Sequence, residues 1–119
     1  MVADGRAGDF RVKLDAIARI PDRHRLVIGV FGHACDGNLH PTIVFDSCDA
    51  AAAQRARYSF DEMVCRCLEL GGSITGEHGV GEYERRYLEP MVGAVELELM
   101  NGVKAVFDPA GILNPGRAI

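Results

Sequence analysis

Only two stretches of this sequence have the composition of β-strands, and a polar segment joins them. Leu26–Phe31, "LVIGVF", is a continuous apolar run rich in β-branched residues, which is typical of a buried strand. Thr42–Phe45, "TIVF", predicts a second strand, with Pro41 at its entrance rather than at its centre. Because two strands make a poor sheet alone, the sequence predicts that further strands or another chain complete the sheet.

Helical patterns surround the two strands. Apolar residues at spacings of three and four predict an amphipathic helix from about Asp9 to about His24, with a kink or an early end near Ile20 because Pro21 interrupts it. A second helix is predicted from about Cys48 to Leu70, an Ala-rich stretch without Gly or Pro.

The ends of the second helix have their own signals. Asp46, Ser47 and Asp49 are good N-cap residues, and Gly71–Gly72 predicts a glycine C-cap. Helical sequence then resumes at about residue 82, is broken or restarted at Pro90, and ends at about residue 107. The predicted order is α-β-β-α-loop-α-α, an α+β domain over residues 10–119 that follows a polar lead-in over residues 1–9.

The composition is that of an ordinary globular chain. In 119 residues, 17 acidic side chains outnumber 13 basic ones, which leaves no basic patch for nucleic acid. No apolar run has the length of a membrane span, and the N-terminus has no signal core. The four cysteines, at positions 35, 48, 65 and 67, fit neither a disulfide framework nor a zinc pair, so we expect free thiols in a reducing cytoplasm.

The polar segment between the strands, "GHACDGNLH", contains two histidines. If the strands pair as a hairpin, His33 and His40 flank a six-residue loop and lie near each other at one end. Directly opposed residues hold their Cβ atoms roughly 4.5–5.5 Å apart, close enough for two imidazoles to bind one metal ion. Asp36, Gly37 and Asn38 suit the tight turn between them.

A third ligand is available in the next dense polar cluster, "GEHG". Glu77 offers a carboxylate and His78 an imidazole, between glycines. Two histidines and one carboxylate leave coordination positions open, which is the pattern of a catalytic metal. The spacing alone leaves two interpretations, a metal site and a solvated polar loop between two strands.

Three motifs resemble one known family. "FGHACDGNLHP", "GGSITGEHGVGEY" and "FDPAGILNPGR" are similar to the C-terminal signatures of FAD-linked oxidases of the vanillyl-alcohol-oxidase superfamily. The nearest branch comprises D-lactate dehydrogenase (cytochrome), the glycolate oxidase catalytic subunit and D-2-hydroxyglutarate dehydrogenase. The resemblance covers nearly the whole chain and implies a partial ferredoxin-like cap, antiparallel strands with helices, followed by C-terminal helices. It also implies that the FAD-binding domain is absent from this sequence.

The resemblance implies roles for individual residues. His33, His40 and Glu77 match metal ligands for Zn, Mn or Fe, and His78 matches the catalytic base. Asn114 matches a residue near the flavin, while Asn38 and Thr42 match substrate contacts. The implied reaction is the FAD-dependent oxidation of a D-2-hydroxy acid to a 2-oxo acid.

Three positions depart from the family pattern. The family usually has Gly at Cys35, often has Asn at Thr42, and usually has Lys at Glu84. The implied partners are a small 2-hydroxy acid and an FAD-binding domain or chain, with self-association through the open strand edges and contact with electron acceptors at the inner membrane. A free-standing, non-redox metal- or ligand-binding module, or an inactive remnant, is the alternative function.

Overall fold

The computed structural model describes residues 7–119, with side chains described from residue 11 onward. The chain divides into two compact units, and the boundary lies between Ser73 and Ile74. Helices combine with one antiparallel two-stranded sheet, so the described residues confirm the predicted α+β class. Residues 1–6, the greater part of the predicted lead-in, lie outside the described residues.

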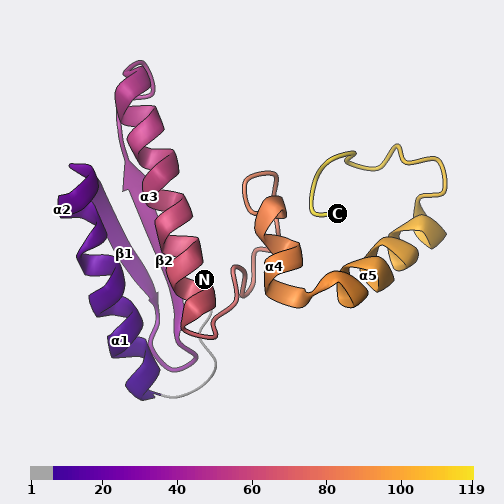
Figure 1. Ribbon diagram of the computed structural model, residues 1–119, viewed down its shortest axis with the longest axis horizontal. Helices are drawn as coiled ribbons and strands as arrows, with labels where there is room; N and C mark the ends of the chain where they lie inside the picture. Colours follow the sequence, from indigo (N-terminus) through magenta and orange to yellow (C-terminus); the bar gives the residue numbers. More distant parts are fainter. Residues whose placement is uncertain (1–6) are drawn as a thin grey trace. The chain divides into compact units, whose positions relative to one another are not determined.

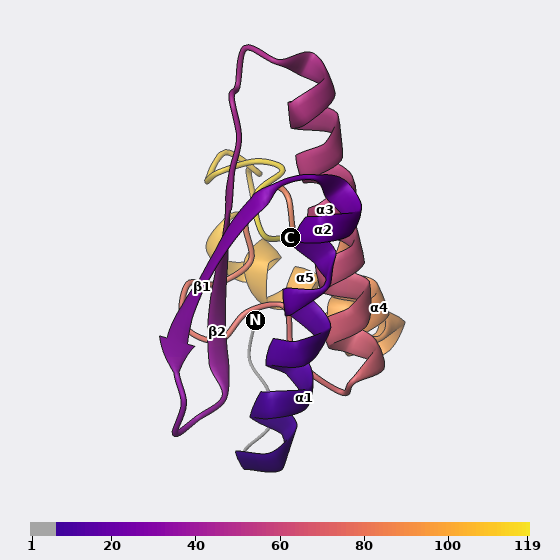
Figure 2. The same ribbon diagram turned by 90° about the vertical axis from the view of Figure 1, so that its left-hand side faces the viewer.

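The first unit contains a helix pair, a hairpin and a long helix (Figure 1). Figure 2 shows that the helices lie on one side of the hairpin. The elements, in chain order, are α1 (Ala7–Ala18), α2 (Ile20–His24), β1 (Val27–His33), β2 (Asn38–Val44) and α3 (Ala50–Glu69).

The break between the first two helices follows from one proline. Helix α1 begins at Ala7, so it includes residues 7–9 of the predicted lead-in, and it ends at Ala18. Helix α2 restarts at Ile20 with Pro21 in its first turn, where the missing N–H needs no intrahelical partner. The predicted interruption near Ile20 is confirmed.

Strands β1 and β2 are both longer than predicted. They pair antiparallel from Val27↔Val44 to His33↔Asn38, so the loop has four residues, 34–37, and not six. Pro41 stands in the middle of β2, opposite Val30, and the prediction of a strand entrance was wrong. In a two-stranded sheet each strand has one edge without a partner strand. A proline is tolerated at such an edge, because its missing N–H removes no hydrogen bond between strands.

The core of the first unit lies between the helices and one face of the hairpin. Four side chains at its centre are at most 4% exposed, and they come from α1, α2, β2 and α3. Three hairpin side chains pack against this centre. The central residues are Ile17, Ile20, Leu39 and Met63, and the packed hairpin residues are Ile28, Val30 and Ile43.

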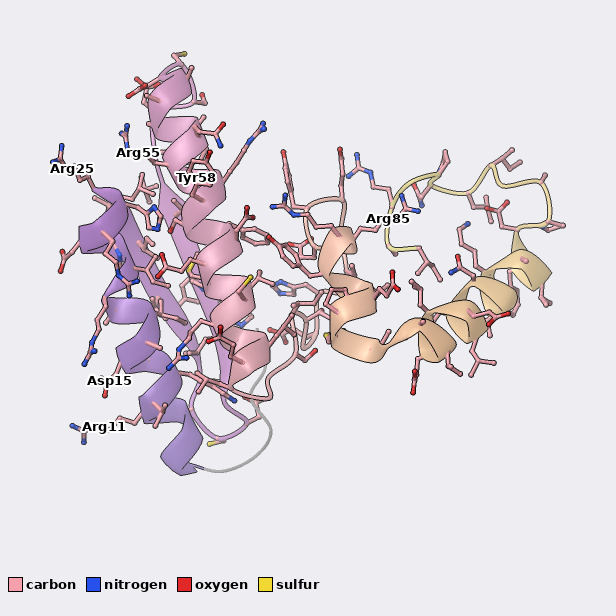
Figure 3. All side chains as sticks on the ribbon, in the orientation of Figure 1. Arg11, Asp15, Arg25, Arg55, Tyr58 and Arg85 are labelled. Carbon is pink, nitrogen blue, oxygen red and sulfur yellow. The ribbon has the colours of Figure 1, made fainter. Side chains whose placement is uncertain are left out.

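The surface of this unit carries exposed ion pairs. Arg11 and Asp15 project together from α1, away from the rest of the unit (Figure 3), with Nε and Oδ2 4.0 Å apart. Arg55 Nη2 of α3 lies 4.0 Å from Asp49 Oδ2. Exposed pairs of this kind contribute at most about 1 kcal/mol each, so the core provides most of the stability.

Both ends of α3 have the predicted caps. Asp49 Oδ1 accepts hydrogen bonds from the amides of Ala51 (2.9 Å) and Ala52 (3.1 Å). At the other end, Gly71 has φ +71°, and the amides of Gly71 and Gly72 donate to carbonyls of the last helical turn, each at 2.9 Å. This arrangement is a Schellman motif, in which glycine adopts the left-handed conformation without a steric cost.

The Asp49 cap gives the first prediction. Asp49→Ala should lower the free energy of unfolding by about 0.5–2 kcal/mol, because two amides at the start of α3 lose their acceptor. Urea unfolding followed by circular dichroism measures the change. Gln54→Ala, an exposed change on the same helix, is the matched control and should stay within about 0.5 kcal/mol of the parent. Equal losses in the two variants would contradict the capping role.

The second unit is helical among the residues described. It contains the 3₁₀ helix η1 (Arg85–Tyr87), α4 (Leu88–Val92) and α5 (Ala94–Phe107). Of the two expectations for Pro90, a break or a restart, the structure shows the restart, because this proline lies in the first turn of α4. The break comes at Gly93, whose φ of +96° ends α4 before α5 begins.

Asp108 organises the segment that follows α5. Its carboxylate accepts hydrogen bonds from Lys104 Nζ (2.6 Å) and from the amides of Ile112 (2.9 Å) and Leu113 (3.0 Å). The hydrogen bond from Lys104 is the main cause that holds the pKa of Asp108 below its usual value, and the two amides act in the same direction.

Asp108 therefore makes the C-terminal segment sensitive to acid. A lowered native pKa means that the carboxylate stabilises the fold above the ordinary Asp pKa of about 3.9, and that this stabilisation is lost as the pH falls through the native pKa. The amide NMR signals of Ile112 and Leu113 should report that loss. In Asp108→Asn these two signals should differ from the parent at neutral pH and lack the acid transition. An unchanged acid transition in the variant would contradict this assignment.

None of the described helices combines the length and the apolar character that crossing a membrane requires.

Candidate functional site

The turn between β1 and β2 is built from the polar residues that predicted it. Asp36 Oδ1 accepts a hydrogen bond from the amide of Asn38 at 3.1 Å, and Gly37 has φ +69°. An aspartate that bonds the backbone two residues later stabilises a turn, and glycine adopts a positive φ without strain. The turn therefore closes the hairpin at His33↔Asn38.

The two histidines of the hairpin lie close together. The ring centroids of His33 and His40 are 5.6 Å apart, and the ring planes are perpendicular. The prediction that these two histidines are directly opposed was wrong, because His33 pairs with Asn38 and His40 pairs with Phe31. The shorter loop sets this register, and the histidines are diagonal neighbours on one face of the hairpin.

The aromatic side chain of Phe31 contacts the imidazole of His40. Its side chain stacks on His40, with centroids 5.3 Å apart and an interplanar angle of 27°. Phe31 is 65% exposed, so it does not belong to the core, although the sequence placed it in a buried strand. Its spacing of two from His33 was the signal that could have shown it on the histidine face.

The histidine face also carries both predicted substrate contacts. Side chains alternate along β2, so Asn38, His40 and Thr42 point to the side opposite Leu39 and Ile43, which pack in the core. Asn38 is buried, at 5% exposure, whereas Thr42 is exposed. One face of the hairpin therefore carries two imidazoles, a buried amide and an exposed hydroxyl.

The other two predicted residues of the metal and acid–base chemistry lie in the second unit. Glu77 and His78 are neighbours in the segment before η1, and Glu77 Oε1 lies 3.7 Å from His78 Nε2. The two side chains are 47% and 78% exposed, respectively. The structure thus brings together one pair of imidazoles on the hairpin and, in the second unit, one carboxylate beside one imidazole.

Glu84, one of the departures from the family pattern, closes the end of the same segment. Its Oε2 accepts a hydrogen bond from the amide of Gly81 at 3.1 Å, and the amide of Arg85 donates to the carbonyl of Gly81 at 3.1 Å. A carboxylate at this position therefore has a local structural role, as acceptor for a backbone amide just before η1.

Asn114 lies in a turn near the end of the second unit. It has φ +46°, a left-handed conformation that Asn tolerates better than most residues, and its carbonyl accepts a hydrogen bond from the amide of Arg117 at 3.1 Å. Arg117 Nη2 in turn lies 3.4 Å from Glu82 Oε2.

All four cysteines are free thiols, as predicted. Cys65 and Cys67, two residues apart on α3, point to different sides: Cys65 is exposed and Cys67 is buried. Burial raises the pKa of the Cys67 thiol, which donates to the carbonyl of Ser73 at 3.4 Å. Cys35 is exposed on the hairpin loop.

Comparison with known proteins identifies the family. Residues 12–118 match the family described as FAD linked oxidases, C-terminal domain. The chain belongs to this family. Its similarity to the glycolate oxidase subunit GlcD is 45% identity over 102 residues in Bacillus subtilis and 39% over 106 residues in Escherichia coli K12. It is also 40% identical over 120 residues to the D-2-hydroxyglutarate dehydrogenase of Stutzerimonas stutzeri.

These relatives of the FAD-linked oxidase domain are much longer than the chain. The alignments cover 86%, 89% and 98% of this chain but 22%, 21% and 25% of the respective relatives. The chain therefore spans about a quarter or less of the curated relatives that it matches. The family resemblance carried by the three motifs is confirmed.

A glycine in β1 gives a prediction for the histidine face of this FAD-linked oxidase domain. A Cβ added to Gly32 would lie 2.0 Å from the carbonyl oxygen of Asn38, whereas one added to Gly29 meets nothing within 4 Å. Gly32→Ala should displace the end of the hairpin and cost about 1–3 kcal/mol, as overpacking does. Gly29→Ala is the matched control.

The imidazole NMR signals of His33 and His40 provide the second measurement. They should shift in Gly32→Ala, because the backbone at Asn38 must move, and should stay in place in Gly29→Ala. Parent-like imidazole signals and unfolding free energy in Gly32→Ala would show that the hairpin end does not depend on the close approach at this glycine.

Proposed function

We propose that the chain is the substrate- and metal-binding C-terminal part of an FAD-dependent oxidoreductase that converts a D-2-hydroxy acid to a 2-oxo acid. Membership in the FAD-linked oxidase family supports the redox class. The substrate class is supported by similarity to proteins named glycolate oxidase subunit GlcD, D-lactate dehydrogenase and D-2-hydroxyglutarate dehydrogenase.

The pair of imidazoles on the hairpin is the observation that carries this proposal. Their centroids are 5.6 Å apart with perpendicular planes, and both residues lie in the paired strands rather than in the loop. We assign His33 and His40 as two ligands of a divalent cation and Glu77 as the third. Two imidazole nitrogens and a carboxylate suit Zn, Mn or Fe and leave positions for substrate oxygens.

The remaining residues act around this centre. In our proposal a cation held by these ligands would supply Lewis-acid chemistry, and bound FAD would supply the redox chemistry. His78 removes the proton of the substrate hydroxyl through a ring nitrogen. Asn38 and Thr42, on the same hairpin face as His40, orient the substrate by hydrogen bonds. Asn114 lies near the flavin.

An exposed apolar surface on α5 supports the proposed partner. No residue of this helix is buried, and several large apolar side chains are more than half exposed. A surface of this kind is typical of an interaction site. We assign it to the flavin-binding part of the enzyme. The exposed residues are Val95, Leu99, Val103, Val106 and Phe107.

The proposed location is the cytoplasm, where electron-acceptor partners at the inner membrane can be reached. The four free thiols support it, because reducing compartments keep cysteines reduced.

Metal binding by the full chain tests the ligand assignment. After dialysis against Zn²⁺, the metal content measured by plasma mass spectrometry should fall in His33→Ala, His40→Ala and Glu77→Gln. It should stay at the parent level in His78→Ala, because the proposed base is not a ligand. His24→Ala is the matched control among the four histidines of the sequence, since His24 contacts Glu62 instead (Nε2 to Oε2, 2.7 Å). Equal metal content in His33→Ala and His24→Ala would exclude the site.

Turnover of the flavin-loaded enzyme tests the role of the base. His78→Ala should keep its metal and lose roughly 10²–10⁴-fold in kcat, the usual contribution of a general base. A variant with near-normal kcat would remove His78 from the mechanism and leave the metal assignment standing.

A further inference from the structure

A groove in the first unit lies between the α1–α2 pair and α3, on elements that the proposed metal chemistry does not use. Its volume is about 360 Å³, within the range of small-molecule sites. Each side contributes four residues at positions i, i+3, i+4 and i+7, so the groove runs along two helical stripes. The lining residues are Ala16, Arg19, Ile20, Arg23, Glu62, Cys65, Arg66 and Glu69.

Most charges in the groove are already paired. Glu62 uses both oxygens, with Arg23 Nη1 2.5 Å from Oε1 and His24 Nε2 2.7 Å from Oε2. Arg66 Nη1 lies 2.7 Å from Glu69 Oε2. Both carboxylates of the groove are therefore engaged by side chains of the first unit.

Arg19 is the exception among the lining charges. Three arginines face two glutamates, which leaves one positive charge in excess. The side chain of Arg19 makes no hydrogen bond or ion pair among residues 11–119, whose side chains the structure describes, although it lines the same groove as both glutamates. A concave surface with one unpaired charge concentrates counter-ions of the opposite sign.

We propose that the groove binds a short-chain aliphatic monocarboxylate, with its carboxylate on the guanidinium of Arg19. A planar carboxylate matches the fork of N–H donors that arginine presents. The single excess charge suits a monoanion, because a dianion such as phosphate would leave one uncompensated negative charge beside Glu62 and Glu69. Ala16 and Ile20 give the wall an apolar part for a short alkyl tail.

Cys65 gives this site a built-in reporter. Its thiol is exposed and lines the groove, whereas Cys48 is exposed and lies outside it. A bound carboxylate should cover Cys65 and slow its alkylation by iodoacetamide, a neutral reagent that does not compete for Arg19. The rate at each cysteine is read by peptide mass spectrometry on the full chain.

The experiment uses sodium butyrate, with sodium chloride and sodium phosphate at matched ionic strength. At a butyrate concentration about four times the dissociation constant, the factor 1 + [L]/Kd is about 5, so alkylation of Cys65 should slow about five-fold. The rate at Cys48 should not change. Arg19→Gln should abolish the protection, while Arg57→Gln, an exposed arginine of α3 outside the groove, should retain it.

Three results would overturn the proposal. One is an equal effect of butyrate at Cys65 and Cys48, which would show a bulk solvent effect. Another is protection that survives in Arg19→Gln. The third is protection by phosphate at the same or a lower concentration than butyrate, which would assign the groove to a different anion.

Discussion

The packing of one face of the β1–β2 hairpin against the helices determines what its other face presents. Ile28 and Ile43 form a directly opposed pair on the core side, and Val30 lies beside them. A slip of one residue would turn these side chains to solvent and the histidines toward the helices. These three side chains are partly buried, and Leu39 on the same face is 3% exposed. Because fully burying one aliphatic side chain contributes roughly 1.5–3 kcal/mol, burial of this face favours the observed register. The diagonal approach of His33 and His40 is therefore a consequence of the hydrophobic core.

Local signals predicted the parts of the fold that depend on local chemistry. Pro21 predicted the helix break, Asp49 the start of α3 and Gly71 its end, because each acts on the backbone of its own turn. Both strands were predicted too short at the end where the hairpin loop joins them. His33 and Asn38 are polar, and only the partner strand shows that pairing continues through them. Pro41 was misplaced for a related reason, since its tolerance depends on the open edge of the sheet.

The sequence predicted which residues form the histidine pair of the candidate site, but it predicted their relative positions only in part. The two flanking strands were enough to place His33 near His40, but the register depends on a four-residue turn that composition does not specify. Phe31 was assigned to the core because its strand is apolar throughout. The arginine-lined groove lay beyond sequence analysis, because its two stripes become neighbours only when α3 packs against the α1–α2 pair. A contact between distant segments leaves no signature in either segment alone.

The stacking of Phe31 on His40 has a consequence for how a ligand would be received. An imidazole on a strand ordinarily samples several χ1 and χ2 orientations, and binding a ligand must restrict them. Immobilising a side chain costs roughly 0.5–1.5 kcal/mol in association reactions. Here the phenyl ring covers one face of the imidazole in the folded chain, so part of this restriction is already made before any ligand arrives. An imidazole nitrogen binds a ligand through a lone pair in the ring plane, which stacking on a ring face does not block. His40 is in this sense preorganised by an aromatic neighbour that itself bears no ligand atom.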